Sequence, residues 1–515
     1  MSARVVALTD ALVAEGVRAI FGIPGSGLSL QLITALEGRR VPFYGASHEA
    51  SAAIMAGAFA ARSGTLGCSV SIRGPGVGNA VSGVVTNHYE QRPTLSLAEA
   101  LARTVAVGMA HKRLDHAAAL APYVKAYATL GEPAATLTAL ATAARTEVPG
   151  PVHLDLVADD PGVLRTPPPP PLREPVGHDA ARALAAARRP IVVAGSLAAR
   201  RPWRARLGRL RVPVFTTLAA KGVVDERGAF AAGVFTGDGK ALAPETRLLS
   251  EADLVVGLGL RRGEILRPPA WPCPVLLLDV VTGVADGLGA THVVSSAADA
   301  DFDAALSELA GRAWGADRVA EAMAAVRRRL LEDPWLPGRV YETLERAVPD
   351  VGCFVTDTGW FCTVAEHVWR APTPEAFLAS ANGRSMGTGL PMAIGAALAD
   401  RDRPTVCAMG DGGVRMYIAD LRLAVEERLP IVFLLLSAGR LGSVAGDGTS
   451  SRRATTVAGA SWFRIAEAMD CPGQQVKDVD GLLAALARWR WSEGPLFVEA
   501  VFDQERYATM TRDVR

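Results

Sequence analysis

Short apolar runs alternate with longer helical patterns along the chain, and they do so in three successive segments. The runs in the first segment cover residues 18–25, 41–49 and 66–76. Those in the second cover 189–196, 212–217, 252–259 and 273–280, and those in the third cover 353–359, 404–412, 429–436 and 495–502. Such runs, separated by helices, are typical of parallel strands that are buried on both faces. The pattern predicts an α/β fold of three doubly wound parallel-sheet domains.

Proline-rich stretches mark the expected domain boundaries. Five consecutive prolines, residues 167–171, lie within the stretch RTPPPPPLREP. Proline cannot join a helix interior or an inner strand, so we expect an extended connector there. A second boundary is expected near residues 327–340, where a charged helical stretch meets Pro334 and Pro337. We therefore predict domains at residues 1–165, 176–325 and 335–515.

Composition narrows the class of protein. The 515 residues are 50% hydrophobic and carry a formal net charge of +1, which gives no support for a nucleic-acid-binding surface. The N-terminal stretch lacks the features of a secretory signal, and no apolar run reaches membrane-spanning length. We therefore predict a cytoplasmic protein with neither nucleic-acid nor membrane partners. Six scattered cysteines without paired spacing predict reduced thiols rather than a zinc site or disulfides.

One glycine-rich turn in the third segment is a candidate phosphate site. Residues Gly410, Asp411, Gly412 and Gly413 follow a predicted strand and open a helix. Backbone amides at the start of a helix favour a phosphate, and Asp411 can hold a Mg²⁺ ion between two phosphate oxygens. Ligands of such sheets bind beyond the carboxyl ends of the strands, where this turn lies. Taken alone, these four residues indicate an ordinary strand-to-helix turn equally well.

The stretch from this turn to the end of the next strand resembles the thiamine diphosphate motif, in which Gly-Asp-Gly is followed at a set spacing by Asn-Asn. Here the pair falls on Ser437 and Ala438. Further stretches resemble the same family in the same order: residues 16–27, 47–64, 74–84, 189–196, 221–237, 252–259 and 385–399. The group contains acetohydroxyacid synthases, benzoylformate decarboxylase and pyruvate decarboxylase. The resemblance implies thiamine diphosphate as cofactor, bound by a pyrimidine-binding first domain and a diphosphate-binding third domain around a central domain.

The resemblance also implies roles for single residues. In the family, a glutamate hydrogen-bonds the pyrimidine ring so that its amino group, as an imine, removes the C2 proton, and Glu49 occupies that place. The alternative for Glu49 is a carboxylate that stabilises the first turn of a helix. Met386 matches the apolar residue beneath the bent cofactor, although methionine also fills gaps in ordinary cores. Gly387 would permit close approach of the backbone.

Four polar residues are candidates for substrate binding. Ser26 resembles the benzoylformate decarboxylase serine that contacts the substrate carboxylate. Arg73, Lys112 and Arg113 are cations where the family often has neutral residues, and the planar fork of arginine suits a carboxylate or phosphate. A solvated surface loop is the alternative for Lys112 and Arg113. If even one of these cations lies in the site, we expect a 2-oxo acid with a second acidic group.

Proton-delivering histidines are absent at the aligned positions. Ile72 stands where the catalytic histidine of benzoylformate decarboxylase aligns, and nothing matches the histidine pair of pyruvate decarboxylase. Proton delivery to the decarboxylated intermediate needs a positioned acid. We therefore expect decarboxylation of a 2-oxo acid with transfer of the acyl carbanion to an acceptor, as in acetolactate synthases. A simple decarboxylase that releases an aldehyde is the alternative. The family's cofactor lies between two chains, which implies a homodimer or homotetramer.

Departures from the family pattern concentrate at the diphosphate end. Ala438 replaces the asparagine that would ligate Mg²⁺, and Trp360 and Phe361 replace a Gln-His pair of acetohydroxyacid synthases. Asp411 and a backbone carbonyl near Arg440 are left as metal ligands, so Mg²⁺ is expected to bind weakly or to be dispensable. The Arg440 side chain is a candidate to reach the diphosphate, or else it faces solvent. A non-catalytic subunit with this fold is the alternative of another class.

Overall fold

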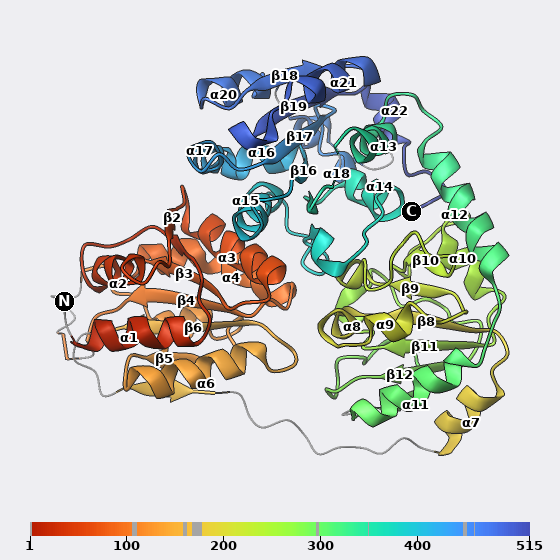
Figure 1. Ribbon diagram of the computed structural model, residues 1–515, viewed down its shortest axis with the longest axis horizontal. Coiled ribbons are helices and arrows are strands. Elements are labelled where there is room, and N and C mark those ends of the chain that lie inside the picture. The colour runs from red at the N-terminus through yellow and green to blue at the C-terminus, as the bar shows by residue number, and fades with distance from the viewer. Residues whose placement is uncertain are drawn as a thin grey trace.

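The computed structural model describes residues 3–102, 104–105, 111–157, 162–166, 178–294, 298–348, 350–445, 451–457 and 459–515. Figure 1 shows three α/β lobes that follow one another along the chain, coloured red to orange, yellow to green, and teal to blue. The fold class predicted from the sequence is confirmed. The predicted proline connector, residues 167–171, lies outside the described residues, and the predicted domain boundaries stay predictions.

The first lobe is built on a seven-stranded sheet in the order β2-β1-β3-β4-β6-β5-β7. The strands are β1 (Ile20–Gly22), β2 (Phe43–Gly45), β3 (Gly67–Ser71), β4 (Thr94–Glu99), β5 (Tyr127–Thr129), β6 (Pro151–Leu156) and β7 (Val163–Arg165). The helices are α1 (Ala3–Ala14), α2 (Leu28–Glu37), α3 (Glu49–Ser63), α4 (Pro75–Tyr89), α5 (His116–Leu120) and α6 (Pro133–Arg145). Strand β7 pairs antiparallel with β5, so this sheet is not wholly parallel as predicted. Its three residues form a partly exposed edge without an apolar run.

The second lobe carries a six-stranded parallel sheet in the order β10-β9-β8-β11-β12-β13. Its strands are β8 (Pro190–Ala194), β9 (Val214–Thr216), β10 (Ala231–Val234), β11 (Leu254–Leu258), β12 (Val275–Leu278) and β13 (His292–Val294). The helices are α7 (His178–Ala186), α8 (Ser196–Arg200), α9 (Arg204–Leu207), η2 (Leu218–Ala220), α10 (Pro244–Leu249), η3 (Arg262–Glu264), α11 (Asp299–Ala310) and α12 (Ala316–Leu330). Helix α12 leads towards the third lobe (Figure 1).

The third lobe carries another six-stranded parallel sheet, in the order β15-β14-β16-β17-β19-β18. Its strands are β14 (Cys353–Thr356), β15 (Phe377–Ala379), β16 (Thr405–Gly410), β17 (Ile431–Ser437), β18 (Gly473–Val476) and β19 (Leu496–Val501). The helices up to β17 are α13 (Pro337–Ala347), α14 (Trp360–Val368), η4 (Pro374–Ala376), α15 (Gly389–Ala399), α16 (Asp411–Tyr417), η5 (Ile418–Asp420) and α17 (Leu421–Glu426). Those after it are α18 (Gly442–Ala445), α19 (Arg452–Thr455), α20 (Trp462–Ala468), α21 (Val479–Arg488), η6 (Trp491–Glu493) and α22 (Gln504–Ala508).

Helices α3 and α15 join the first and third lobes. Both are rich in small residues, and one apolar core contains Ile54 and Met55 of α3 with Met392 and Ala396 of α15. A Cβ atom added at Gly395 would lie 2.3 Å from the backbone oxygen of Met55, so only glycine allows this approach. The close contact fixes the start of α3 relative to the third lobe.

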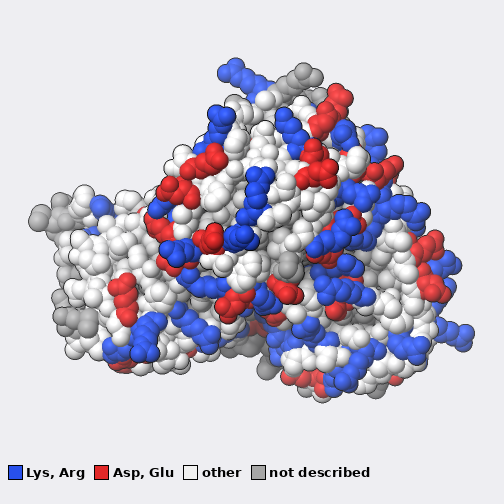
Figure 2. Space-filling model, turned by 45° about the horizontal axis from the view of Figure 1, so that its top comes forward, with Lys and Arg blue, Asp and Glu red and all other residues white. Residues whose placement is uncertain are grey.

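Figure 2 shows basic and acidic side chains interspersed over the face in view. Within the described residues, no helix combines the length and apolarity needed to cross a bilayer. All six cysteines are free, and five of them are buried.

Candidate active site

Glu49 is a buried carboxylate at the first position of α3, with 8% of its surface exposed. The side-chain amide of Asn79 on α4 donates a hydrogen bond of 3.0 Å to its Oε2. Oε1 has no hydrogen-bond partner among the described residues. A Cβ atom at Gly76 would lie 3.4 Å from Oε1, so the missing side chain leaves room beside this oxygen. Glu49 therefore has one anchored oxygen and one oxygen available to a ligand.

The residues before Glu49 tie the helix start to the third lobe. Nδ1 of His48 accepts the backbone N–H of Ala50 at 3.1 Å and so caps α3. The His48 ring lies 5.9 Å from the ring of Tyr417 at the end of α16. The backbone N–H of Ser47 donates to Oδ1 of Asp420 at 2.7 Å. His48 thus has a structural role, because it caps α3 and its ring lies near Tyr417.

Asp411 is held by the loop that follows β17. Its Oδ1 accepts the Ser437 hydroxyl at 2.8 Å, and its Oδ2 accepts the backbone N–H groups of Ala438 and Gly439 at 2.8 and 2.9 Å. A carboxylate offers about four acceptor positions, so three of those on Asp411 are already used. In the sequence, Ser437 was noted only because it replaces the first asparagine of the family motif. Its hydroxyl instead fixes the predicted phosphate turn to the neighbouring strand.

These residues do not fit a complete magnesium site. The side chain of Ala438 contains no oxygen, and the Asp411 carboxylate already binds three donors of its own chain. Mg²⁺ requires a near-octahedral set of oxygen ligands. Asp411, the Ser437 hydroxyl and backbone carbonyls are the protein oxygens left at this place. The two metal ligands expected from the sequence, Asp411 and the backbone carbonyl near Arg440, stay predictions.

The cavity beside the phosphate turn is small, and its lining includes aromatic residues and one arginine. It has a volume of about 100 Å³ and is lined by Trp360, Phe361, Tyr507 and Arg440, among others. The Arg440 guanidinium lies 3.5 Å from the hydroxyl of Thr455, and no acidic partner is found for it among the described residues. Arg440 is therefore the cation of this cavity, as a role at the diphosphate would require.

Met386 covers the phosphate turn from one side. A Cβ atom at Gly412 would lie 2.7 Å from the Met386 sulfur, while Met386 itself remains 39% exposed. Gly387 has a φ of +86°, a conformation that glycine adopts without strain. Asn79, the partner of Glu49, and Met386 also line one open pocket of about 430 Å³ together with Tyr417. Residues of the first and third lobes thus line the same pocket.

Asp357 lies directly under the turn and was not singled out from the sequence. It follows β14, is 1% exposed, and accepts the backbone N–H groups of Thr358 and Gly387 at 2.7 and 3.0 Å. Burial raises the pKa of Asp357 to about 7, although the hydrogen bonds from neighbouring amides oppose that shift. A Cβ atom at Gly413 would collide with Oδ2 of Asp357, at 1.9 Å. The third glycine of the turn, Gly413, is therefore required by this carboxylate.

Ser26 lies on an exposed loop whose shape is set by a second buried acid. Oε1 of Glu99 accepts the backbone N–H groups of Gly27 and Ser29 at 3.2 and 3.0 Å, and the Ser29 hydroxyl at 2.6 Å. A Cβ atom at Gly25 would lie 2.9 Å from the same oxygen. Glu99 ends β4, so its position after a strand was the available sequence signal. Ser26 is presented at the carboxyl edge of the first sheet.

Three predicted substrate residues meet at the same edge. Arg73 follows β3, Lys112 and Arg113 belong to the segment before α5, and all three line a cavity of about 500 Å³. A Cβ atom at Gly74 would lie 2.2 Å from the carbonyl oxygen of Lys112, so the two segments touch through backbone. The structure thus brings Arg73, Lys112 and Arg113 together. Of these, Arg73 lies shortly before Gly76 in the chain, and Gly76 lies beside Glu49.

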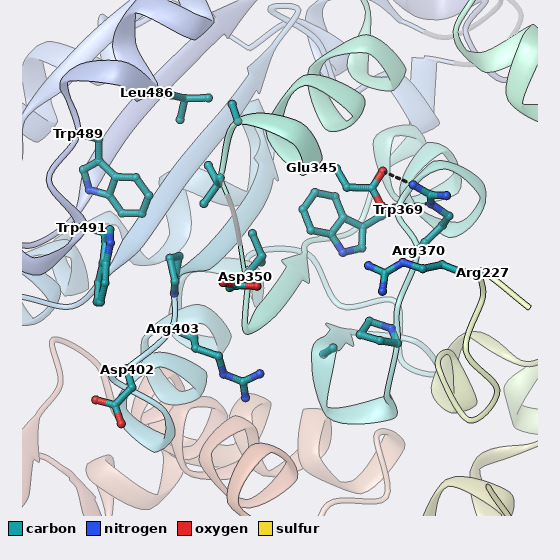
Figure 3. A pocket seen from close by; sticks show the side chains of 16 residues that line it. Arg227, Glu345, Asp350, Trp369, Arg370, Asp402, Arg403, Leu486, Trp489 and Trp491 are labelled. Atoms are coloured by element: carbon teal, nitrogen blue, oxygen red, sulfur yellow. Dashed lines mark hydrogen bonds and ion pairs between the residues drawn. The ribbon is translucent and has the colours of Figure 1, made fainter. Parts of the chain in front are cut away.

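A larger cavity, of about 650 Å³, lies elsewhere on the third lobe (Figure 3). Trp369, Arg370 and Arg403 line it together with residues at the amino ends of β14 and β16. Arg370 is paired with Glu345, as the dashed line in Figure 3 marks, and Arg403 is paired with Asp400. Ligands of parallel sheets bind at the carboxyl ends of the strands. The turn at residues 410–413 follows the carboxyl end of β16, whereas this cavity lies at the opposite edge of the sheet.

Comparison with known proteins shows the family to which the chain belongs. Family models of the thiamine pyrophosphate enzymes match all three parts of the chain: the N-terminal binding domain at residues 5–119, the central domain at 178–280 and the C-terminal binding domain at 357–500. The chain belongs to the thiamine pyrophosphate enzyme family. The family models also agree with the fold derived from the apolar runs.

Curated relatives of this family differ in their reactions. A probable acetolactate synthase large subunit of Methanococcus aeolicus is 26% identical, covering 85% of this chain and 81% of the relative. A probable 2-ketoarginine decarboxylase of Pseudomonas aeruginosa is 28% identical, covering 86% and 83%. A sulfoacetaldehyde acetyltransferase of Castellaniella defragrans is 26% identical, covering 94% and 89%. Full-length similarity therefore extends to both acyl transfer and decarboxylation.

Proposed function

We propose that the protein is a thiamine diphosphate-dependent enzyme that decarboxylates a 2-oxo acid and transfers the acyl group to an acceptor. The observation that supports this most is the setting of Glu49, a buried carboxylate with Oε2 anchored by Asn79 and Oε1 facing the space at Gly76. A carboxylate that only stabilised its own helix would need neither burial nor a partner 30 residues away. The expected homodimer or homotetramer and the cytoplasmic location belong to the same proposal.

The residues of the chain divide the work between two ends of the cofactor. When bound, thiamine diphosphate supplies a nucleophilic carbon and accepts the electrons that decarboxylation releases. Oε1 of Glu49 would hold a proton at the pyrimidine ring, and Asn79 would keep the carboxylate oriented. The turn from Gly410 to Gly413 would receive the diphosphate, and Met386 would pack against the cofactor and exclude water.

Transfer to an acceptor is favoured over release of an aldehyde by the histidines of the site. His48 uses Nδ1 to cap α3. His116 uses both ring nitrogens, because Nε2 accepts the N–H of Gly74 and Nδ1 lies 2.7 Å from Oδ1 of Asp155. Ile72 stands at the position that aligns with the catalytic histidine of benzoylformate decarboxylase. No acid among the described residues is assigned to protonation of an aldehyde product, so a carbonyl acceptor would compete for the acyl group.

A second candidate function rests on the diphosphate end. Ala438 removes a metal ligand, and Asp411 is bound by its own loop. These observations favour a non-catalytic subunit that retains the fold of the family without binding the cofactor. The two candidates differ in whether thiamine diphosphate binds and whether Glu49 acts on it.

Two measurements on cofactor-free protein decide between them. The first is a calorimetric titration with thiamine diphosphate, with Mg²⁺ and with a chelator. The second follows exchange of the cofactor C2 proton with D₂O by NMR. We expect saturable binding, and an exchange rate that Glu49→Gln lowers by about 10²- to 10⁴-fold, the size of a general acid–base contribution. The exposed Glu37→Gln is the matched control and should leave the rate unchanged.

Three results would count against the proposal in different ways. Absence of binding under both conditions would favour the non-catalytic subunit. Binding with equal exchange in wild type and Glu49→Gln would remove Glu49 from the mechanism. Binding and normal exchange, followed by aldehyde as the product of 2-oxo acids with and without an added aldehyde acceptor, would favour the simple decarboxylase.

A further inference from the structure

A cationic cavity lies next to the candidate active site, at the carboxyl edge of the first sheet. Its volume is about 500 Å³, and its described basic residues are Arg73, Lys112, Arg113 and Arg165. Arg165 comes from the antiparallel edge strand β7 and was not predicted as a site residue. Two acidic residues, Asp115 and Asp155, share the lining. Among the described residues, the cations therefore outnumber the acids.

Both acids are engaged by their own surroundings. Asp115 accepts the backbone N–H of Ala118 at 2.9 Å and caps α5. Asp155 accepts the Tyr127 hydroxyl at 2.5 Å and lies 2.7 Å from Nδ1 of His116 and 2.9 Å from Nε2 of His153. These donors hold Asp155 in its ionised form. Neither acid has an ion pair with a cation of the cavity among the described residues.

Arg73 is the cation best placed to bind a ligand. Its Nε is buried and has no hydrogen-bond partner in the part of the chain that the structure describes. A buried donor without a partner costs free energy, so an acceptor that reaches it gains affinity. Arg113 donates to the carbonyl oxygen of Val105 at 2.6 Å, and the Arg165 guanidinium lies 5.9 Å from the centre of the Tyr127 ring. Those two are positioned by other contacts yet keep further N–H groups available.

Buried contacts fix the loop that carries Arg73. The backbone N–H of Gly74 donates to Nε2 of His116 at 3.0 Å, so the proton of that ring is on Nδ1 and points to Asp155. Gly74 has a φ of +65°, and a side chain there would collide with the carbonyl oxygen of Lys112. His116 and Asp155 are therefore positioning residues. They hold Arg73 just before α4, whose first turn contains Gly76 beside Glu49.

We propose that this cavity binds the second acidic group of the donor substrate, so that the enzyme acts on a 2-oxo acid with a distal carboxylate. The inference rests on the proposed function for the other end of the substrate. The planar guanidinium of Arg73 pairs with one carboxylate, while Lys112, Arg113 and Arg165 add to the field. The reacting keto acid end lies towards Glu49, on the far side of Gly76.

Two five-carbon probes that differ at one position test the proposal. 2-Oxoglutarate carries the distal carboxylate and 2-oxopentanoate ends in a methyl group. Their dissociation constants are measured by calorimetry on the full-length chain, with and without thiamine diphosphate. We expect 2-oxoglutarate to bind about ten- to a hundredfold more tightly, as for a charge-assisted hydrogen-bonded pair. Arg73→Gln should abolish that difference, and Arg165→Gln should reduce it.

Arg209→Gln is the matched control, because Arg209 is an exposed arginine of the second lobe. It should leave both dissociation constants unchanged, and circular dichroism should show that all three variants are folded. Equal affinity for the two probes in the wild type overturns the proposal. An unchanged preference in both Arg73→Gln and Arg165→Gln overturns it as well, as does an equal loss in Arg209→Gln.

The outcome is separable from that of the proposed function. Probe binding needs no turnover, so it reports on the cavity whether or not the cofactor binds. A preference for 2-oxoglutarate without cofactor binding would support an acid-binding cavity and remove the donor-substrate role, which overturns the proposal in its stated form. Cofactor binding with Glu49-dependent proton exchange, but without the preference, would overturn this inference alone.

Discussion

The two ends of the candidate site are built in opposite ways. At the glutamate end, Glu49 has one hydrogen bond, from Asn79, and Gly76 leaves room at its other oxygen. At the diphosphate end, Asp411 has three donors from its own chain, and the adjoining cavity measures only about 100 Å³. Under the proposed function, the group that activates the cofactor and the groups that would hold its metal can therefore change separately. At the diphosphate end, Ala438 departs from the expected motif.

Position 438 departs from the expected motif at the diphosphate end. An asparagine at 438 would offer an oxygen to a metal ion, whereas Ala438 contributes to Asp411 only through its backbone N–H. The loss of one polar contact costs roughly 1–3 kcal/mol, which weakens binding but does not abolish it. Each of the following substitutions changes either the glutamate end or the diphosphate end, and the largest expected effect comes first.

The largest effect concerns stability at the diphosphate end. Burial raises the pKa of Asp357 to about 7 from an ordinary 3.8. Between these values Asp357 binds a proton in the folded protein but not in the unfolded chain, so its contribution to the free energy of unfolding should fall as pH rises from about 4 to about 7. The slope is up to about 1.4 kcal/mol per pH unit, or about 4 kcal/mol over the range. Denaturant unfolding at several pH values measures it.

Asp357→Asn should flatten this slope, because the amide does not titrate. The variant also loses one acceptor oxygen for the amide of Gly387, so its stability at low pH should be lower. The slope is therefore the readout, not the absolute stability. An identical pH dependence in wild type and variant would show that Asp357 does not govern the stability of this end.

The second prediction restores the missing side-chain ligand of the expected metal site. Ala438→Asn should raise the affinity for thiamine diphosphate about ten- to a hundredfold in the presence of Mg²⁺, because the amide oxygen completes the ligand set. The affinity in chelator should stay that of the wild type. Ala438→Leu, which has the same shape without the oxygen, should show no gain. Calorimetric titration checks all three proteins.

Failure of Ala438→Asn would itself be informative about the comparison. If the affinity with Mg²⁺ does not rise, the bonds from Ser437 and Gly439 keep Asp411 unavailable to the ion. The diphosphate end would then be closed by the whole loop and not by one missing side chain.

Much of the fold could be predicted from the sequence, because strands buried on both faces are continuous apolar runs. The runs at 353–359 and 404–412 correspond to β14 and β16, each fully or almost fully buried. Strand β7 escaped prediction because three partly exposed residues carry no such signal. Its antiparallel pairing with β5 depends on tertiary contacts alone.

The site was harder to predict, because its residues are joined by contacts between distant positions. Glu49 was found through the family resemblance and Asp411 through the glycine-rich turn, and their roles stay predictions. The partners Asn79, Glu99 and Asp357 were missed, since each contact joins residues 30 or more positions apart. Glu99 and Asp357 do end or follow strands. The rule that ligands lie beyond strand ends could have singled them out.

The third prediction concerns the cation of the diphosphate end. Arg440 lines the cavity beside Asp411, and no acidic partner is found for it among the described residues. Arg440→Ala should weaken thiamine diphosphate binding about tenfold in chelator, since it removes a charged donor. The exposed Arg490→Ala, in the same lobe, is the control. Equal metal dependence of binding in wild type and Arg440→Ala would contradict a role for Arg440 at the diphosphate.

The smallest expected effect tests the open end with a single methyl group. In Gly76→Ala, the new Cβ would lie 2.8 Å from Cγ2 of Ile72 and 3.4 Å from Oε1 of Glu49. We expect C2-proton exchange on bound thiamine diphosphate to slow severalfold, because the space beside Oε1 narrows while the carboxylate and Asn79 remain. Gly78→Ala, on the same helix, meets no atom within 4 Å and is the matched control for altered helix propensity. Equal exchange rates in the two variants would mean that the room at Gly76 has no bearing on how Glu49 acts. The two ends would then differ only in the number of hydrogen bonds that Glu49 and Asp411 accept.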